Sequence, residues 1–226
     1  MEKIEGLLGK NSELKKSKIF AWQDVLRSVS GLFLACFMLL HMLTTGSVVF
    51  GERVFEAFIH AAEPGGVWQI TNVVAGIVFA IFVLHAFLAV RKFPSNYRAW
   101  LAYKAHKIRM RHRETTLWWF QFLSGFALFF LASFHLIGNI FGDQVTVANV
   151  ASHFARLHLF YFALLFCVVL HASIGMYRLI FKWVSINASV AKRQTIRNQI
   201  KFAVLAVWWG FFLFSVFADF KWLSLQ

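Results

Sequence analysis

The chain has 226 residues, of which 59% are hydrophobic and 15% charged, and its formal net charge is +13. Because soluble domains contain about 45–50% apolar residues, this composition excludes an ordinary soluble fold and indicates a polytopic membrane protein. A membrane-spanning helix needs about 20 mostly apolar residues, and none of the long apolar runs alternates as a barrel strand does. The predicted fold class is therefore all-α, an integral bundle of five transmembrane helices at 28–50, 67–90, 116–141, 155–181 and 198–220.

The positive charge is distributed in a way that indicates membrane topology rather than nucleic-acid binding. Basic residues gather before the first span, between the second and third, and between the fourth and fifth, whereas the other side has only Arg53, Arg156 and Lys221. Loops rich in lysine and arginine stay on the cytoplasmic side. We therefore predict a cytoplasmic N-terminus, a periplasmic C-terminus and no nucleic-acid partner.

Segments outside the predicted spans suggest how the chain is organised. Residues 1–23 form a polar N-terminal arm, and Asp24 is a candidate N-cap for the first span. Residues 24–226 then make a single transmembrane domain. The basic and aromatic segment 91–115 predicts a helix on the membrane surface or a docking face for a soluble subunit. Span 198–220 contains no histidine, so we expect it to serve packing and to face lipid.

Each of the first four predicted spans contains a histidine within its apolar run, and the four histidines fall at two depths: they are His41, His85, His135 and His171. With about 1.5 Å of rise per residue, His41 and His135 belong in the outer half of the membrane, and His85 and His171 belong in the inner half. Ionisable residues inside a membrane are costly and usually functional. Two pairs, each drawn from two spans, predict two metal centres stacked across the bilayer.

The chemistry of these pairs favours haem iron. Histidine is a standard axial ligand of haem, whereas zinc or non-haem iron takes more protein ligands at each site. A proton relay in a transporter or channel is the alternative. Relays usually include carboxylates, and the predicted spans carry Asp or Glu only near their ends, at Asp24 and Asp219. We therefore predict two haem b groups, with one histidine pair on each iron.

Two glycines recur at the same distance before the outer histidines. Gly31 lies ten residues before His41, and Gly125 lies ten before His135. Ten residues of helix span about 15 Å, which places both glycines at the depth of the inner histidine pair. Small residues let bulky groups approach a helix closely, so we predict that both leave room for the inner haem. Ordinary helix packing is the alternative interpretation.

Two stacked haems predict a path for electrons between the two sides of the membrane. The sequence has no cysteine cluster for iron–sulfur and no dinucleotide-binding glycine motif, so the terminal chemistry belongs to partner subunits on the inner side. The natural outer partner is a quinone, whose redox chemistry moves protons. Glu63, just before Pro64, is our candidate for the acidic group at the quinone. The alternative is a loop acid with no special role.

Four stretches, two of which contain predicted ligands, carry a family resemblance: Ser30–Leu34, Leu84–Pro94, Thr115–Trp119 and Leu170–Leu179. They resemble the dihaem cytochrome b subunit of fumarate reductases, a five-helix anchor of the epsilonproteobacterial type, over most of the chain. The resemblance implies a multi-pass protein of the bacterial inner membrane. It also implies that His85 and His171 hold the haem proximal to the iron–sulfur subunit, and that His41 and His135 hold the distal haem.

The resemblance implies further partners and site residues. An iron–sulfur subunit and a flavoprotein subunit, where fumarate and succinate interconvert, are expected on the cytoplasmic side, with menaquinol or menaquinone as the substrate in the bilayer. A dimer of heterotrimers is expected. Glu63 matches the acidic residue at the quinol site, where it would accept a proton. Ser28, Trp118 and Lys182 match positions near the haem propionates.

One residue departs from the family pattern. Val169 stands two residues before His171, where the best-known members carry a glutamate on a proposed transmembrane proton route. The departure leaves open whether turnover is electrogenic and whether the complex reduces fumarate or oxidises succinate. A dihaem anchor of another quinone-linked dehydrogenase, such as a hydrogenase or formate dehydrogenase, is a further alternative.

Overall fold

The computed structural model describes residues 2–91, 96–110, 113–184 and 189–225, and helices make up nearly all of them. The helices are α1 (Glu2–Gly46), α2 (Glu52–Ala62), α3 (Gln69–Val90), α4 (Tyr97–Met110), α5 (Arg113–Ile140), α6 (Val147–Trp183) and α7 (Val190–Leu223). Two 3-10 helices, η1 (Ser47–Phe50) and η2 (Pro64–Gly66), flank α2. Within the described ranges there is no strand, so the predicted all-α class is confirmed.

Five helices are long and apolar enough to cross a membrane, which confirms the predicted number of spans. They cover Lys18–Phe50, Gln69–Val90, Glu114–Ile140, Val147–Trp183 and Lys192–Leu223. The fourth begins earlier than predicted, because Thr146 caps α6 by accepting a 3.2 Å hydrogen bond from the backbone N–H of Asn149. The segment 91–115 contains the predicted extra helix, α4.

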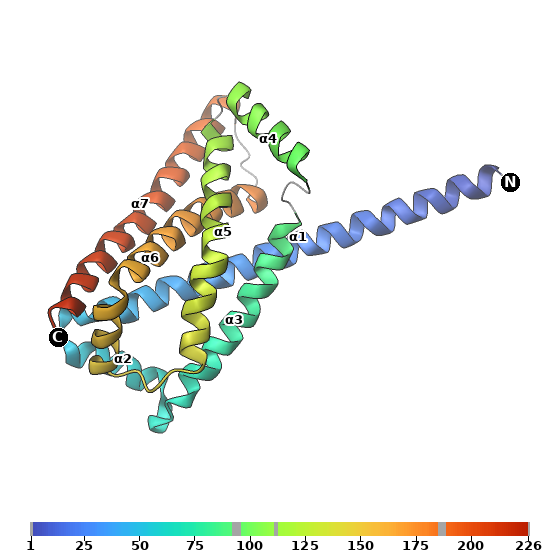
Figure 1. The fold of residues 1–226 in the computed structure, drawn as a ribbon. Coiled ribbons are helices and arrows are strands. Elements are labelled where there is room, and N and C mark those ends of the chain that lie inside the picture. Colours follow the sequence, from blue (N-terminus) through green and yellow to red (C-terminus); the bar gives the residue numbers. More distant parts are fainter. Residues whose placement is uncertain (1, 92–95, 111–112, 185–188, 226) are drawn as a thin grey trace.

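The predicted helix start at Asp24 is wrong. The helix α1 passes through Asp24 without interruption, and its N-terminal part projects beyond the bundle (Figure 1). Residues 2–23 contain no proline, so nothing in their backbone chemistry ends the helix there. The carboxylate of Asp24 instead pairs with Arg91, which directly follows α3, and with Lys182 of α6.

The five spans form one bundle, with α4 at one end and α2 and the C-terminus at the other (Figure 1). In the bundle, α6 packs between α5 and α7, while α3 packs against α1 and α5. We call the end near α4 the basic end, and the end near α2 and the C-terminus the α2 end. At the α2 end, a core of Val48, Phe55, Ala151 and Trp222 joins η1, α2, α6 and α7.

Candidate functional site

A cavity of about 1200 Å³ extends through the bundle from the basic end to the α2 end. Its wall contains all four histidines predicted as ligands, together with residues of every span. Pockets for one small ligand usually measure about 300–1,000 Å³. The space therefore exceeds that of a pocket for a single small molecule, and the four histidines share it.

The histidines nearer the α2 end, His41 of α1 and His135 of α5, face each other. Their ring centroids lie 6.0 Å apart, and the ring planes are inclined by 60°. Two metal–imidazole bonds of about 2 Å each, placed in line, put ring centres about 6 Å apart. The spacing therefore suits one metal ion between the two rings. Phe37 stacks on His41 at 5.9 Å, and Tyr161 meets His135 edge-on at 5.9 Å.

The histidines nearer the basic end are held through Nδ1. The Nδ1 of His171 lies 2.9 Å from the carbonyl oxygen of Gln121, which can only accept, so this nitrogen carries the proton. The Nδ1 of His85 lies 3.1 Å from Oγ of Ser30, whose own proton is donated to the Arg27 carbonyl at 3.2 Å. Both rings are thereby fixed with an unprotonated Nε2, the tautomer that binds metal through Nε2.

The glycines at matched positions lie directly against these two rings. A Cβ on Gly31 would stand 2.9 Å from Cε1 of His85, and a Cβ on Gly125 would stand 2.8 Å from Cε1 of His171. Their predicted depth agrees with this arrangement. In this structure, however, each glycine makes room for an imidazole ring. The ring of His171 can then reach the carbonyl of Gln121, and the ring of His85 can reach the hydroxyl of Ser30.

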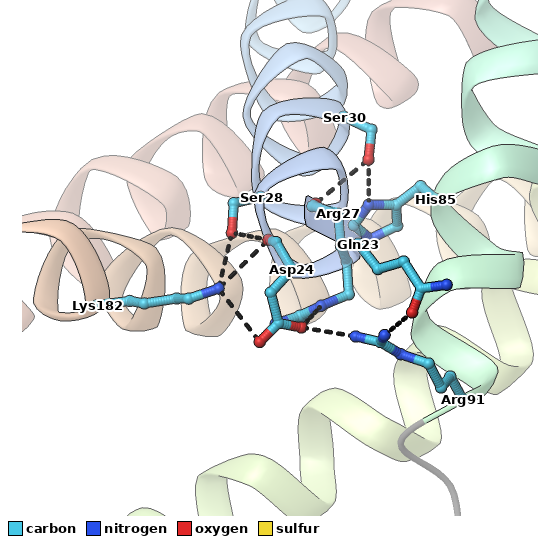
Figure 2. Close-up of polar contacts among 8 residues, drawn as sticks. All are labelled: Gln23, Asp24, Arg27, Ser28, Ser30, His85, Arg91 and Lys182. Atoms are coloured by element: carbon cyan, nitrogen blue, oxygen red, sulfur yellow. Dashed lines mark hydrogen bonds and ion pairs between the residues drawn. The ribbon is translucent and has the colours of Figure 1, made fainter. Parts of the chain in front are cut away.

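At the basic end, the basic side chains of Arg27, Arg91 and Lys182 surround Asp24 (Figure 2). Arg91 donates to Asp24 Oδ1 at 2.8 Å, and Lys182 Nζ lies 3.7 Å from Asp24 Oδ2. Lys182 also donates to Ser28 Oγ at 3.2 Å. The structure thus brings Ser28 and Lys182, which the family resemblance places near a propionate, into direct contact.

Arg27 completes this group and was not predicted from the sequence. Its side chain lines the cavity, and its buried Nε lies 3.9 Å from Asp24 Oδ1 and has no hydrogen-bond acceptor among the described residues. Arg27, Arg91 and Lys182 outnumber the Asp24 carboxylate, and a buried guanidinium N–H without an acceptor is costly. The basic end of the cavity therefore favours an anionic group. The sequence offered one signal for this role, because Arg27 is a basic residue directly before Ser28 at the start of an apolar run.

Trp118 also lies on the cavity wall, in an aromatic group that ties α4 to α5. Its ring centroid is 4.6 Å from that of Tyr103 and 5.6 Å from that of Phe122. These ring contacts hold Trp118 against α4, whereas Ser28 and Lys182 bond to each other between α1 and α6. The structure therefore places all three residues on the same cavity, but in two separate sets of contacts.

Glu63 lies at the opposite end, just after α2, and only 2% of its surface is exposed. A tight turn follows, in which Gly65 and Gly66 adopt φ values of 70° and 74° that side-chain-bearing residues disfavour. The turn brings Thr71 of α3 within reach, and its hydroxyl shares its one proton between the Trp68 carbonyl at 2.6 Å and Glu63 Oε1 at 3.2 Å. Thr71 lines the cavity, so a buried carboxylate stands one hydrogen bond from it.

The fifth span does more than face lipid, contrary to our expectation. Ser215 and Asp219 of α7 lie on the cavity wall near the α2 end. Hydropathy alone could not reveal this, because both sides of α7 carry large apolar residues and the rotation of the helix is set by its neighbours.

Comparison with known proteins shows the family to which the chain belongs. The family model described as "Succinate dehydrogenase/Fumarate reductase transmembrane subunit" matches residues 95–214. The chain belongs to this family. It is also 42% identical over 189 residues to the "Fumarate reductase cytochrome b subunit" of Wolinella succinogenes, covering 80% of this chain and 73% of that protein. The protein of the same name from Helicobacter pylori is 44% identical over 194 residues, covering 80% and 74%.

Membership of the family agrees with the resemblance recognised in the sequence. The five apolar helices and the family together identify a multi-pass protein of the inner membrane. Two positioning groups were missed by sequence reasoning, the hydroxyl of Ser30 and the carbonyl of Gln121. The repeated Ser-Gly pairs at 30–31 and 124–125 were the only signal for the first.

Proposed function

We propose that this chain is the dihaem cytochrome b membrane anchor of a fumarate reductase, passing electrons between menaquinol or menaquinone and an iron–sulfur subunit. The observation that carries the proposal is the placement of four histidines in two pairs on one cavity of about 1200 Å³. A haem would supply one-electron transfer through its iron. The protein supplies the axial ligands, their orientation and the surroundings that set the potential.

The residues divide into a distal and a proximal haem site. His41 and His135 would hold the distal iron, and their 6.0 Å ring separation supports this assignment. His85 and His171 would hold the proximal iron, and the bonds at Nδ1 support it by leaving Nε2 free on both. Gly31 lets the His85 ring reach its place, and Gly125 does the same for His171.

The basic end would hold the propionates of the proximal haem. Propionates are anionic, and Lys182 and Ser28 already form a donor pair on the cavity wall. Arg27 offers a buried N–H that has no acceptor among the described residues. Trp118 lines the same cavity and would contact the macrocycle or its propionate through its ring or indole N–H.

Glu63 would accept a proton when menaquinol is oxidised at the α2 end. Burial of a carboxylate that has one hydroxyl partner is costly in an apolar setting, and such groups mark functional sites in membrane proteins. The contact of the Thr71 hydroxyl with Oε1 joins the carboxylate to the cavity wall. The quinol hydroxyl would approach it through the cavity, whose wall includes Thr71.

The catalytic partners would bind at the basic end, which is predicted to be cytoplasmic. An iron–sulfur subunit would exchange electrons with the proximal haem, and a flavoprotein subunit would interconvert fumarate and succinate. We propose a dimer of these heterotrimers. The direction can run as fumarate reduction or as succinate oxidation, and an anchor for another quinone-linked dehydrogenase is the alternative assignment.

Redox-titrated visible absorption of the purified complex, with haem quantified per polypeptide, tests the proposal. Two b-type haems with separate midpoints are expected. Replacing His85 with alanine should remove the proximal haem, and replacing His135 should remove the distal one. A colourless protein, or one that keeps both haems with unchanged spectra in these variants, would overturn the assignment.

A second experiment addresses the quinol site. Glu63→Gln keeps the size of the side chain and its acceptor for Thr71 but cannot take up a proton. We expect menaquinol oxidation to fall at least tenfold while both haems stay bound and remain reducible by dithionite. Glu56→Gln, at an exposed acid on α2, the helix that ends just before Glu63, is the matched control. Undiminished quinol oxidation in Glu63→Gln would remove Glu63 from the site.

A further inference from the structure

Asp219 is a carboxylate on the wall of the central cavity that the proposed function does not use. It lies on the membrane-spanning part of α7 and is half-buried. Among the described residues it has no hydrogen-bond or ion-pair partner. The cations of the described cavity wall, Arg27, Arg178 and Lys182, belong to the basic end, whereas Asp219 lies toward the α2 end.

A second polar group stands one helical turn before it. Ser215 is 6% exposed and lines the same cavity, and its buried Oγ has no hydrogen-bond partner in the part of the chain that the structure describes. A serine in a helix normally donates to the carbonyl four residues earlier, as Ser28 does with Asp24 at 2.7 Å. The unsatisfied hydroxyl of Ser215 therefore indicates that a polar ligand or water belongs at this position.

The rotation of α7 that turns both residues inward is firmly set. Trp222, with 0% exposure, donates from Nε1 to the carbonyl of Thr45 at 3.2 Å and meets Phe55 edge-on at 4.9 Å. Ser215, Asp219 and Trp222 are spaced four and then three residues apart, so they share one face of the helix. The tryptophan anchors that face against α1 and α2, and the two polar residues follow it into the cavity.

We propose that Asp219 and Ser215 form a proton-exchange site that serves the redox group between His41 and His135. When an electron from the quinol enters that group, the Asp219 carboxylate takes one proton from water at the α2 end. When the electron leaves, the proton returns to water. Each electron is thus accompanied by one proton, which offsets the charge added inside a membrane, where uncompensated charge is costly.

Ser215 would orient the site and hold the water that delivers the proton. Its hydroxyl can donate to the carboxylate form of Asp219 or to a bridging water, and it can accept from the protonated form. The other titratable groups on the described cavity wall at this end come from α1, α5, the loop before α6, and α6; η1 contributes none. They are His41, His135, Asp143, His153 and Tyr161.

The inference rests on the proposed function, and infrared redox-difference spectroscopy of the haem-loaded complex tests it. A carbonyl-stretch band of a protonated carboxylic acid should grow on reduction of the distal haem and should be lost in Asp219→Asn. Asp143→Asn, which removes an exposed acid from the same end of the cavity, should keep the band. Ser215→Ala should shift the band, because the carboxyl group loses its hydrogen-bonding neighbour.

A potentiometric measurement gives an independent readout. One proton per electron corresponds to about 59 mV per pH unit, and the distal midpoint should carry part of this slope in the wild type. Asp219→Asn should lose most of that part, and Asp143→Asn should keep it. If Asp219→Asn does not assemble, Asp219→Glu should retain the slope and displace the infrared band.

The possible failures are distinguishable. A complex without a haem between His41 and His135 would refute the proposed function and this inference with it. Two normal haems, with the band and the slope of Asp219→Asn equal to those of the wild type, would refute the role of Asp219 alone. Loss of the band in Asp143→Asn instead would refute the role of Asp219 and would assign the proton to Asp143 in the loop before α6.

Discussion

Gly31→Ala adds a methyl group where the structure has a histidine ring. The new Cβ would stand 2.9 Å from Cε1 and 3.4 Å from Nδ1 of His85, whereas carbon atoms prefer about 3.5–4.0 Å. The ring must therefore move by several tenths of an ångström or more. Its bond to Ser30, already 3.1 Å long, would stretch toward the limit of a hydrogen bond. The side chain that we propose as a proximal ligand loses both its place and its anchor.

The expected magnitude follows from packing. Overfilling a well-packed site costs about 1–3 kcal/mol, and disturbing the group that orients a metal-bound histidine costs about 10–100-fold in affinity. We expect the proximal haem to be bound at least tenfold more weakly in Gly31→Ala, while the distal haem stays at full occupancy. Haem per polypeptide and the two reduction midpoints, measured on the purified complex, report the two sites separately.

Gly76→Ala is the matched control, because a Cβ at Gly76 on α3 meets no atom within 4 Å. Alanine is also the better helix former by about 1 kcal/mol, so this variant should keep both haems and should not lose stability. Full occupancy and wild-type midpoints in Gly31→Ala would refute the reasoning. An equal loss of haem in Gly76→Ala would show that the effect is not specific to the ring contact.

Two further variants test the hydrogen bond that orients His85 and a hydrogen bond that joins two spans. Ser30→Ala removes the acceptor for Nδ1 of His85, which makes the imidazole a weaker electron donor to the iron, so the reduction midpoint of the proximal haem should rise. Ser30→Thr should restore the midpoint. Ser124→Ala is the control and should leave the midpoint unchanged, because the Ser124 hydroxyl bonds only backbone carbonyls. Tyr177→Phe removes a 2.5 Å hydrogen bond to Glu114 between α6 and α5. It should destabilise the subunit by about 1–3 kcal/mol, seen as a lower melting temperature with both haems present; an unchanged melting temperature would refute this role.

The number of spans and the depth of each histidine could be read from the sequence. A membrane requires long apolar helices because unpaired backbone groups are costly in lipid, and the constant rise of a helix converts residue number into depth. Residue numbers alone therefore assign His41 and His135 to one level of the bilayer. The same arithmetic places Gly31 and Gly125 at the level of the other two histidines.

Only the tertiary structure decided which face each helix presents. Depth is set by position along one helix, but rotation is set by packing against its neighbours. Arg27 and Asp24 lie at the basic end of the cavity because the rotation of α1 turns them toward the ends of α3 and α6. Ser215 and Asp219 line the cavity because Trp222 locks α7 against Thr45 and Phe55. Hydropathy is averaged over all faces of a helix, and so it cannot predict these contacts.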